Sequence, residues 1–176
     1  MRKLSKLLNI FIFLFIFTQT LIAKEPVLAT LVTIVSNDVL EFVYENKKFS
    51  CLAYGVITVD DIYAKADKDS QCKKSIEKFY NKRKDLIYYT NSKMKVYQSY
   101  PIIFKKDKRC IINIAGEKTL SEFLIEKGLA VKKLLFKDRE YNYYFEHAEK
   151  KSKLNQEGIW KENSLEDCRS YIDTLK

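Results

Sequence analysis

The order of strand-like and helix-like segments is the sequence feature that most constrains how this 176-residue chain can fold. Three early segments are rich in β-branched and apolar residues and are separated by short polar turns, as in a β-meander. They comprise residues 27–35, 39–44 and 49–59. The polar stretch that follows, residues 60–69, is expected to be a loop.

A predicted helix covers residues 70–84. Ser70 is a favourable capping residue for its first turn, because a serine hydroxyl can accept a hydrogen bond from a free backbone N–H there. Ile76, Phe79 and Tyr80 fall on one face of this helix, which is therefore expected to pack against the rest of the protein.

Two more strands and two more helices complete the prediction. The strand-like segments are residues 86–90 and 110–114, and the long basic stretch between them, 91–109, contains short apolar runs able to extend them. The helices cover residues 119–127 and 138–157. The first of them begins with T-L-S-E, the pattern of a capping box, and each is followed by a glycine.

The resulting order, β-β-β-α-β-β-α-α, predicts an α+β protein that is mainly β. Short strands in this order, with a helix between the third and fourth, are typical of a five-stranded OB-fold barrel. We therefore expect such a barrel with three helices packed against it. Trp160, which follows the last helix, is expected to pack the end of that helix onto the barrel.

The N-terminus has the layout of a secretory signal peptide. Three basic residues precede an apolar run over residues 7–22, and the small residue Ala23 follows just before a charged pair. The apolar run is short for a helix that spans a membrane, which needs roughly 20 apolar residues. Leu21 is larger than the residue preferred near a cleavage site, so an uncleaved anchor remains the alternative.

We therefore expect residues 1–23 to be a signal peptide and residues 24–176 to form one domain, exported to the periplasm or the extracellular space. No stable membrane insertion is expected after cleavage. Removing the signal removes three basic residues and no acid, which lowers the formal net charge from +9 to +6. A positive charge of this size suits a polyanion or an anionic membrane surface as partner, although solubility alone is an equally simple explanation.

All four cysteines lie in the predicted mature part, at Cys51, Cys72, Cys110 and Cys168. An even number of cysteines in an exported protein indicates disulfides, because the compartment is oxidising. A metal site is the weaker interpretation. The spacings are long, no C-x-x-C occurs, and His147 is the only histidine in the sequence.

Five segments in the expected order are similar to the thermonuclease-like family, whose type member is staphylococcal nuclease. They are TIVSNDVLEF, GVITVD, KDKRCIINI, TLSEFLIEKGLAV and EHAEKKSKLNQEGIW. The resemblance extends over residues 28–160, almost the whole predicted mature chain. It implies a barrel that binds DNA or RNA, and we expect the protein to be a monomer.

The resemblance also implies a site. In this family carboxylates on the barrel hold Ca²⁺, a Glu activates water, and two arginines clamp the phosphate as charge develops. Asp38 matches the first calcium carboxylate, and Thr58 matches a position that contributes to the metal site through its backbone. Asp60 falls at the position of the catalytic Glu but is one methylene shorter. Arg109 matches the second arginine.

Two positions depart from the family pattern. Ile57 stands where the family has the second calcium carboxylate, which weakens the expected Ca²⁺ site. Leu52 stands where the family has the first arginine. Losing one preorganised donor to a developing oxyanion costs on the order of 10²–10³ in rate. An arginine fork is no easier to replace, so we expect slow hydrolysis.

Two functions of different classes are compatible with this pattern. The first is an exported, calcium-dependent phosphodiesterase that is weak or altered in substrate. The second is a non-catalytic envelope protein that uses the barrel to bind nucleic acid or a protein partner. Leu134 and Phe136 stand where the family presents stacking tyrosines, which argues against ordinary nucleotide recognition. Aromatic residues are plentiful around position 143, but at least half of them are expected to be packing residues.

The family resemblance also implies how the cysteines pair. In an OB barrel the third and fifth strands are neighbours, and Cys51 and Cys110 lie on those strands beside the two positions that match arginines. We therefore predict a Cys51–Cys110 disulfide. This leaves a Cys72–Cys168 disulfide, which would tie the C-terminal segment to the first helix.

Overall fold

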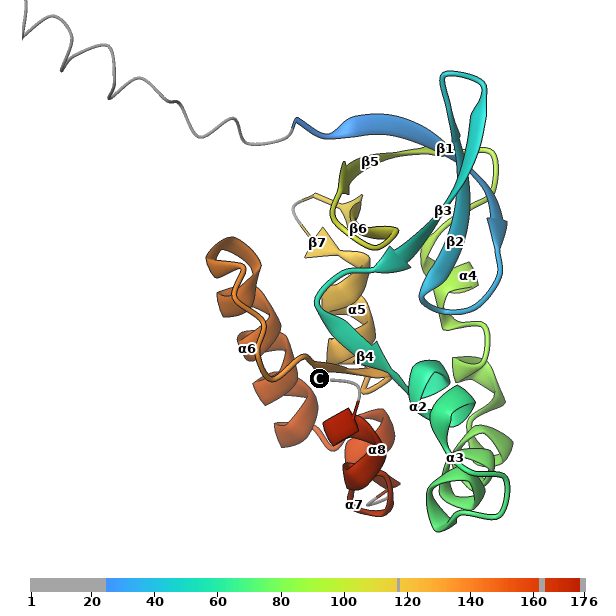
Figure 1. Cartoon of the computed structure of the whole chain (residues 1–176), viewed down its shortest axis with the longest axis vertical. Helices are drawn as coiled ribbons and strands as arrows, with labels where there is room; N and C mark the ends of the chain where they lie inside the picture. Colours follow the sequence, from blue (N-terminus) through green and yellow to red (C-terminus); the bar gives the residue numbers. More distant parts are fainter. Residues whose placement is uncertain (1–24, 117, 162–163, 175–176) are drawn as a thin grey trace, which may run out of the picture.

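The computed structural model describes residues 25–116, 118–161 and 164–174 (Figure 1). The predicted signal peptide, residues 1–23, lies outside the described residues. Within the described part, no helix is both long and apolar enough to cross a membrane.

The larger sheet is a closed barrel. Its strands are β1 (Val27–Ile34), β2 (Val39–Tyr44), β3 (Lys47–Ala53), β5 (Ser99–Phe104) and β6 (Arg109–Ala115), in the order β3-β2-β1-β5-β6. A parallel pairing of β3 with β6 closes the cylinder, and the short strand β7 (Lys118–Thr119) pairs with β6. This confirms the predicted α+β class and the five-stranded, OB-like barrel.

A second, two-stranded sheet lies beside the barrel. Its strands β4 (Val56–Thr58) and β8 (Ala130–Lys132) pair antiparallel. The sequence predicted one unbroken strand over residues 49–59, and that prediction is wrong because Gly55 breaks it. Gly55 has φ +76°, and a Cβ there would lie 2.4 Å from the ring of Phe136. Only glycine allows the chain to turn this closely past the ring, so β4 leaves the barrel.

The three predicted helices are present. They are α3 (Gln71–Lys82), α5 (Leu120–Glu126) and α6 (Arg139–Leu154). Ser70 caps α3 by accepting from the N–H of Lys73 at 3.2 Å. The predicted capping box of α5 forms as well, since the N–H of Thr119 donates to Oε2 of Glu122 at 2.8 Å and the hydroxyl of Thr119 accepts in return.

Additional short helices correct two predictions. The expected loop over residues 60–69 contains α2 (Val59–Lys65), because Thr58 and Asp61 form a second capping box at its start. The expected strand over residues 86–90 is instead a 3₁₀ turn, η1 (Lys84–Leu86), followed by α4 (Tyr89–Lys93). The basic stretch after it supplies the missing strand β5.

The chain after α6 folds back onto the other helices. The 3₁₀ turn η2 (Gly158–Trp160) is followed by α7 (Ser164–Asp167) and α8 (Arg169–Thr174). Trp160 packs half-buried against the core, and Nζ of Lys153 lies 4.5 Å from the centre of its ring. Figure 1 shows α7 and α8 in red, close to α2 and α3.

Both predicted disulfides are present. Cys51 and Cys110 join β3 to β6 with Cα atoms 5.5 Å apart, at the point where the barrel closes. Cys72 and Cys168 join α3 to the C-terminal helices with Cα atoms 4.7 Å apart. A bridge that closes so long a loop stabilises by about 4–5 kcal/mol in the chain-entropy model.

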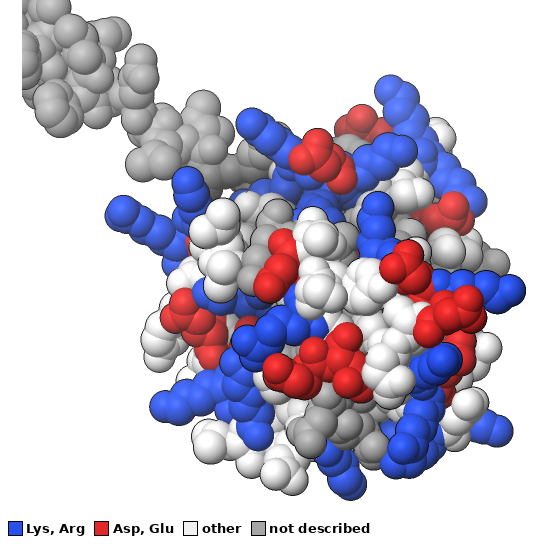
Figure 2. Space-filling model, turned by 60° about the horizontal axis from the view of Figure 1, so that its bottom comes forward, with Lys and Arg blue, Asp and Glu red and all other residues white. Residues whose placement is uncertain are grey.

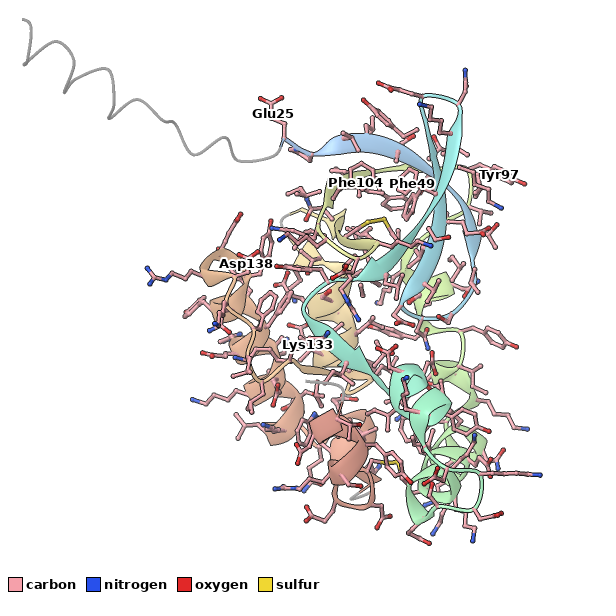
Figure 3. All side chains as sticks on the ribbon, in the orientation of Figure 1. Glu25, Phe49, Tyr97, Phe104, Lys133 and Asp138 are labelled. Carbon is pink, nitrogen blue, oxygen red and sulfur yellow. A yellow bond between two sulfur atoms is a disulfide. The ribbon has the colours of Figure 1, made fainter. Side chains whose placement is uncertain are left out.

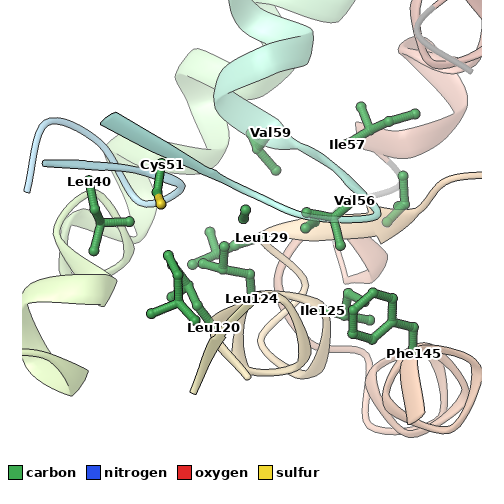
Figure 4. Close-up of a cluster of buried hydrophobic side chains, with 14 of the residues drawn as sticks. Leu40, Cys51, Val56, Ile57, Val59, Leu120, Leu124, Ile125, Leu129 and Phe145 are labelled. Atoms are coloured by element: carbon green, nitrogen blue, oxygen red, sulfur yellow. The ribbon is translucent and has the colours of Figure 1, made fainter. Parts of the chain in front are cut away.

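The hydrophobic core continues from the barrel into the space below β4. Leu31, Leu40 and Phe42 fill the barrel. Leu124, Leu129 and Phe145 fill the space between β4, α5 and α6, as Figure 4 shows. The small sheet is therefore fixed to the barrel by continuous packing.

A close backbone contact joins the end of α5 to the end of α6. Gly128 and Gly158 both have positive φ, and the N–H of Ile159 donates to the carbonyl of Gly128 at 3.1 Å. A Cβ on Gly128 would lie 2.2 Å from the carbonyl oxygen of Glu157. The two segments can approach this closely only because glycine stands there.

Replacing Gly128 by alanine should therefore destabilise the protein by about 2–4 kcal/mol, since it adds a backbone clash to the strain of a positive φ. Urea denaturation would measure the loss. Gly116→Ala is the matched control, because Gly116 also has positive φ but has nothing within 4 Å of an added Cβ. It should cost about 1 kcal/mol. Equal losses in the two variants would contradict this explanation.

Candidate active site

The turn between β1 and β2 is the anchor of the candidate site. Asn37 is buried and holds this turn against the segment that precedes β5. Its amide donates to the carbonyl of Leu86 at 2.9 Å, and its Oδ1 accepts from the N–H of Thr90 at 3.0 Å. These contacts also explain why residues 86–90 form no strand, since their backbone groups bond to Asn37 rather than to a sheet.

Asp38 follows in the same turn and is also buried. Its Oδ1 accepts from the hydroxyl of Ser36 at 2.9 Å, and its carbonyl accepts from the N–H of Ala53 at 2.9 Å. Burial, together with the negative charges of Asp61 and Asp60, raises the pKa of the Asp38 carboxyl to about 6, although the bond from Ser36 opposes the shift. A carboxylate that stays ionised at neutral pH in such surroundings is typical of a functional site.

Asp60 lies in the first turn of α2 and is held by two donors. The hydroxyl of Tyr80, on α3, donates to Oδ1 of Asp60 at 2.7 Å, and the backbone N–H of Asn37 donates to the same carboxylate. Burial still raises the pKa of Asp60, although both hydrogen bonds oppose the shift. The pKa of Tyr80 is raised by burial and by the charge of Asp60, so this phenol remains a proton donor.

Arg109 begins β6 and lies directly across from Leu52 in the parallel ladder. Its Nη1 donates to the carbonyl of Ala53 at 2.9 Å. The N–H of that same residue bonds to Asp38, so Arg109 and Asp38 are joined through one peptide segment of β3. The structure thus brings Asp38 and Asp60 close enough for their charges to interact, and it links Arg109 to the main chain of Asp38 through Ala53.

Leu52 and Ile57, which depart from the family pattern, lie in different environments. Leu52 is half-buried beside Arg109. Ile57 is only 2% exposed and pairs with Val131. In Figure 4 its side chain lies on the opposite face of β4 from Leu124 and Leu129 and points towards the C-terminal helices. An apolar residue therefore fills the place expected for a calcium ligand.

The residues present do not fit a calcium site of the family's kind. No group of three or more His, Cys, Asp or Glu side chains in the described ranges is placed to hold a metal ion. The carboxylate of Asp60 is bonded to Tyr80 and Asn37, and Thr58 and Asp61 bond to each other as the capping box of α2. Asp38 is left as one buried carboxylate, whereas Ca²⁺ takes six to eight oxygen ligands.

A surface cavity of about 490 Å³ opens next to Asp60. It is lined by residues of α2 and α3, namely Asp60, Tyr63, Glu77, Tyr80 and Asn81. Tyr63 donates its hydroxyl to Glu77 at 3.0 Å, so the polar groups of the lining are bonded to one another. Asp60 is therefore reachable from solvent through this cavity.

Sequence reasoning missed two residues of this site. Tyr80 was assigned to the apolar face of its helix, where it does lie, but its hydroxyl reaches Asp60. Asn37 falls in the short polar turn between the first two predicted strands, and nothing else in the sequence marks it. A weak signal existed, because a tyrosine on an inward face near predicted acidic site residues can bond to one of them.

On the face that Figure 2 shows, the surface charge does not gather into one basic patch. Figure 2 shows Lys and Arg side chains spread over the visible face, with Asp and Glu among them. The net positive charge alone therefore does not locate a polyanion site, and the individual groups around Arg109 are the better guide to one.

The raised pKa of Asp38 makes a prediction about stability. Because this pKa lies above the ordinary value of 3.8, the folded protein binds more protons than the unfolded chain between about pH 4 and pH 6. The free energy of unfolding should fall as pH rises through that window. Asp38→Asn, which keeps the shape and the bond from Ser36, should be about 1–3 kcal/mol more stable than the wild type at pH 8.

Urea denaturation at pH 4 and pH 8 would measure this difference, which should vanish at the lower pH. Asp69→Asn, on an exposed turn, is the control and should leave the pH dependence unchanged. An Asp38→Asn variant that is equally or less stable than the wild type at pH 8 would show that the buried charge carries no cost.

Comparison with known proteins identifies the family of the chain. A family model described as staphylococcal nuclease homologue matches residues 58–162, more than half of the chain. A search of curated proteins found no match. The family match begins at Thr58, so Asp38, Leu52 and Ile57 lie before it, and Asp60 and Arg109 lie within it. The chain therefore belongs to the staphylococcal nuclease homologue family.

Proposed function

We propose that this protein is an exported member of the nuclease family that binds the phosphate backbone of DNA or RNA at the barrel mouth and hydrolyses it slowly. The observation that carries the proposal is the junction at Ala53, whose N–H donates to the main-chain carbonyl of Asp38 and whose carbonyl accepts from Nη1 of Arg109. This junction joins the turn that carries the buried Asp38 to the strand that begins at Arg109.

The chemistry of these groups suits a phosphodiester. A guanidinium offers parallel donors that match two phosphate oxygens, and it stabilises the charge that develops as water attacks phosphorus. A carboxylate whose pKa is about 6 can accept the proton of that water near neutral pH. The new bond joins the water oxygen to phosphorus, the bond to the leaving oxygen breaks, and solvent protonates the leaving group.

The same residues account for slow turnover. The nuclease family is generally calcium-dependent, but Ile57 is apolar and buried where the second ligand is expected. Leu52 adds no charge beside Arg109. Each missing group is expected to lower the rate by on the order of 10²–10³, by comparison with the loss of an oxyanion donor.

Recognition of bases is expected to differ from that of the family. Phe136, at one of the two positions matched to stacking tyrosines, packs between Tyr54 and Phe145 at ring-centre distances of 5.2 Å from each. Leu134, at the other, is exposed but has no ring. Binding would therefore rely on the phosphate backbone and show little sequence preference.

Export is the remaining part of the proposal. Two disulfides are compatible with folding in an oxidising compartment, such as the periplasm or the extracellular space. The signal-like segment of residues 1–23 supports the same location. The alternative function, binding without hydrolysis in the envelope, is favoured by the lack of a metal-binding cluster in the part of the chain that the structure describes.

A cleavage assay on residues 24–176 decides between the two functions. The wild type should cleave single-stranded DNA poorly in millimolar Ca²⁺. Restoring both missing groups with Leu52→Arg and Ile57→Asp should raise calcium-dependent cleavage by at least ~10²-fold. A further Asp38→Ala change should abolish that gain, because it removes the other carboxylate that matches a calcium ligand of the family.

Ile57 is buried, so its replacement by Asp also tests folding, and circular dichroism must accompany the assay. Leu52→Arg alone is the safer variant, since Leu52 is half-buried and a long cation can extend to solvent. Two results would contradict the proposal. One is fast, EDTA-sensitive cleavage by the wild type. The other is a folded, calcium-binding double variant that remains inactive.

A further inference from the structure

Lys133 lies at the end of β8, and its N–H donates to the carbonyl of Gly55 at 3.0 Å. This bond extends the β4–β8 ladder by one residue beyond the pair Val56–Lys132. Because successive residues of a strand face opposite sides, Lys133 shares its face with Val131 and Ile57. Figure 3 shows Lys133 beside β4.

The neighbouring lysine has a different environment. Nζ of Lys132 contacts Oδ1 of Asn142 at 2.7 Å and Oε1 of Glu146 at 2.8 Å, so its charge is neutralised on α6. Lys133 makes no ion pair with any described residue, and neither does Arg109, whose guanidinium is bonded to the carbonyl of Ala53. Both side chains are half-buried.

Lys133 and Arg109 are held against the same short segment of the chain, because the N–H of Lys133 bonds to the carbonyl of Gly55 and Nη1 of Arg109 bonds to the carbonyl of Ala53, two residues earlier. Burial lowers the pKa of Lys133, the positive charge of Arg109 lowers it further, and the negative charges of Asp61 and Asp107 oppose these effects. Neither cation forms an ion pair with a described residue, and their mutual repulsion raises the free energy of the folded protein. A bound anion would remove that repulsion and accept hydrogen bonds from both.

We propose that Lys133 is the second cation of the phosphate site, and that Lys133 and Arg109 together hold one phosphate group of a nucleic-acid backbone. The proposal rests on the proposed function and deepens it. Lys133 approaches from β8 and supplies the positive charge that Leu52 does not. An ammonium acts as a point charge rather than a fork, so it can hold a phosphate without restoring the arginine's contribution to catalysis.

Binding of a fluorescein-labelled, single-stranded DNA 12-mer, followed by fluorescence anisotropy over a salt series, tests the proposal. Lys133→Met should weaken binding by about 5–10-fold and lower the slope of log K against log salt by about 0.7. Lys137→Met is the matched control, because it removes the same charge from an exposed position four residues away. Lys133→Arg should restore the wild-type affinity.

A double-mutant cycle tests whether the two cations act on one phosphate. The losses caused by Arg109→Met and Lys133→Met should be less than multiplicative, because each cation needs the other to hold the same group. Urea midpoints should be compared for all variants, so that a loss of folding is recognised. Losses that multiply would show two independent contacts and overturn the shared site.

Inorganic phosphate provides a second readout that does not require nucleic acid. Its addition should shift the NMR signals of the Lys133 side chain and leave those of Lys137 in place. If Lys133→Met binds DNA with the same affinity and salt slope as Lys137→Met, while Arg109→Met loses binding, the inference is overturned. The proposed function would still stand. A wild type that binds phosphate at Lys133 but no oligonucleotide supports the anion site and overturns the proposed function.

Discussion

The parallel pairing of β3 with β6 is the contact on which the rest of the structure depends. It closes the barrel, and the disulfide between Cys51 and Cys110 fixes it covalently. The same seam places Arg109 against Ala53, and Ala53 in turn binds the turn that carries Asp38. Barrel closure and site assembly are therefore one event, and loss of this seam would separate the guanidinium from the carboxylate.

Electrostatics distinguish this region from the rest of the surface. Several partly buried charges elsewhere are paired, as in Lys105–Asp138 and Lys127–Glu157. At the barrel mouth Asp38 and Asp60 have raised pKa values, and Arg109 and Lys133 make no ion pairs among the described residues. Such unbalanced, half-buried charges lower stability, so their presence together is better explained by a ligand than by folding. A phosphate diester would pair with the two cations, and a neighbouring carboxylate would act as the general base for its hydrolysis.

The sequence predicted those features that depend on local pattern. Runs of β-branched and apolar residues indicated β1 and β2, the T-L-S-E motif indicated the start of α5, and the family resemblance implied both disulfides. Features that depend on distant contacts were missed. Asn37, in the turn between β1 and β2, bonds to the backbone of Leu86 and Thr90 and so fixes the path of that segment. Gly55 ends a strand because a side chain there would clash with the ring of Phe136. The proposed role of Lys133 depends on its pairing with β4 and on the nearby Arg109, and no local sequence pattern reveals either contact.

The central claim is that the site has kept phosphate binding and lost the calcium that accompanies it in the family. The most direct test is the affinity of the wild type for a single-stranded oligonucleotide, measured with and without millimolar Ca²⁺ at constant ionic strength. We predict the same dissociation constant with and without Ca²⁺, within about twofold, because Ile57 leaves Ca²⁺ with too few ligands. Binding that tightens tenfold or more on adding Ca²⁺, and loses that gain in Asp38→Asn, would contradict it.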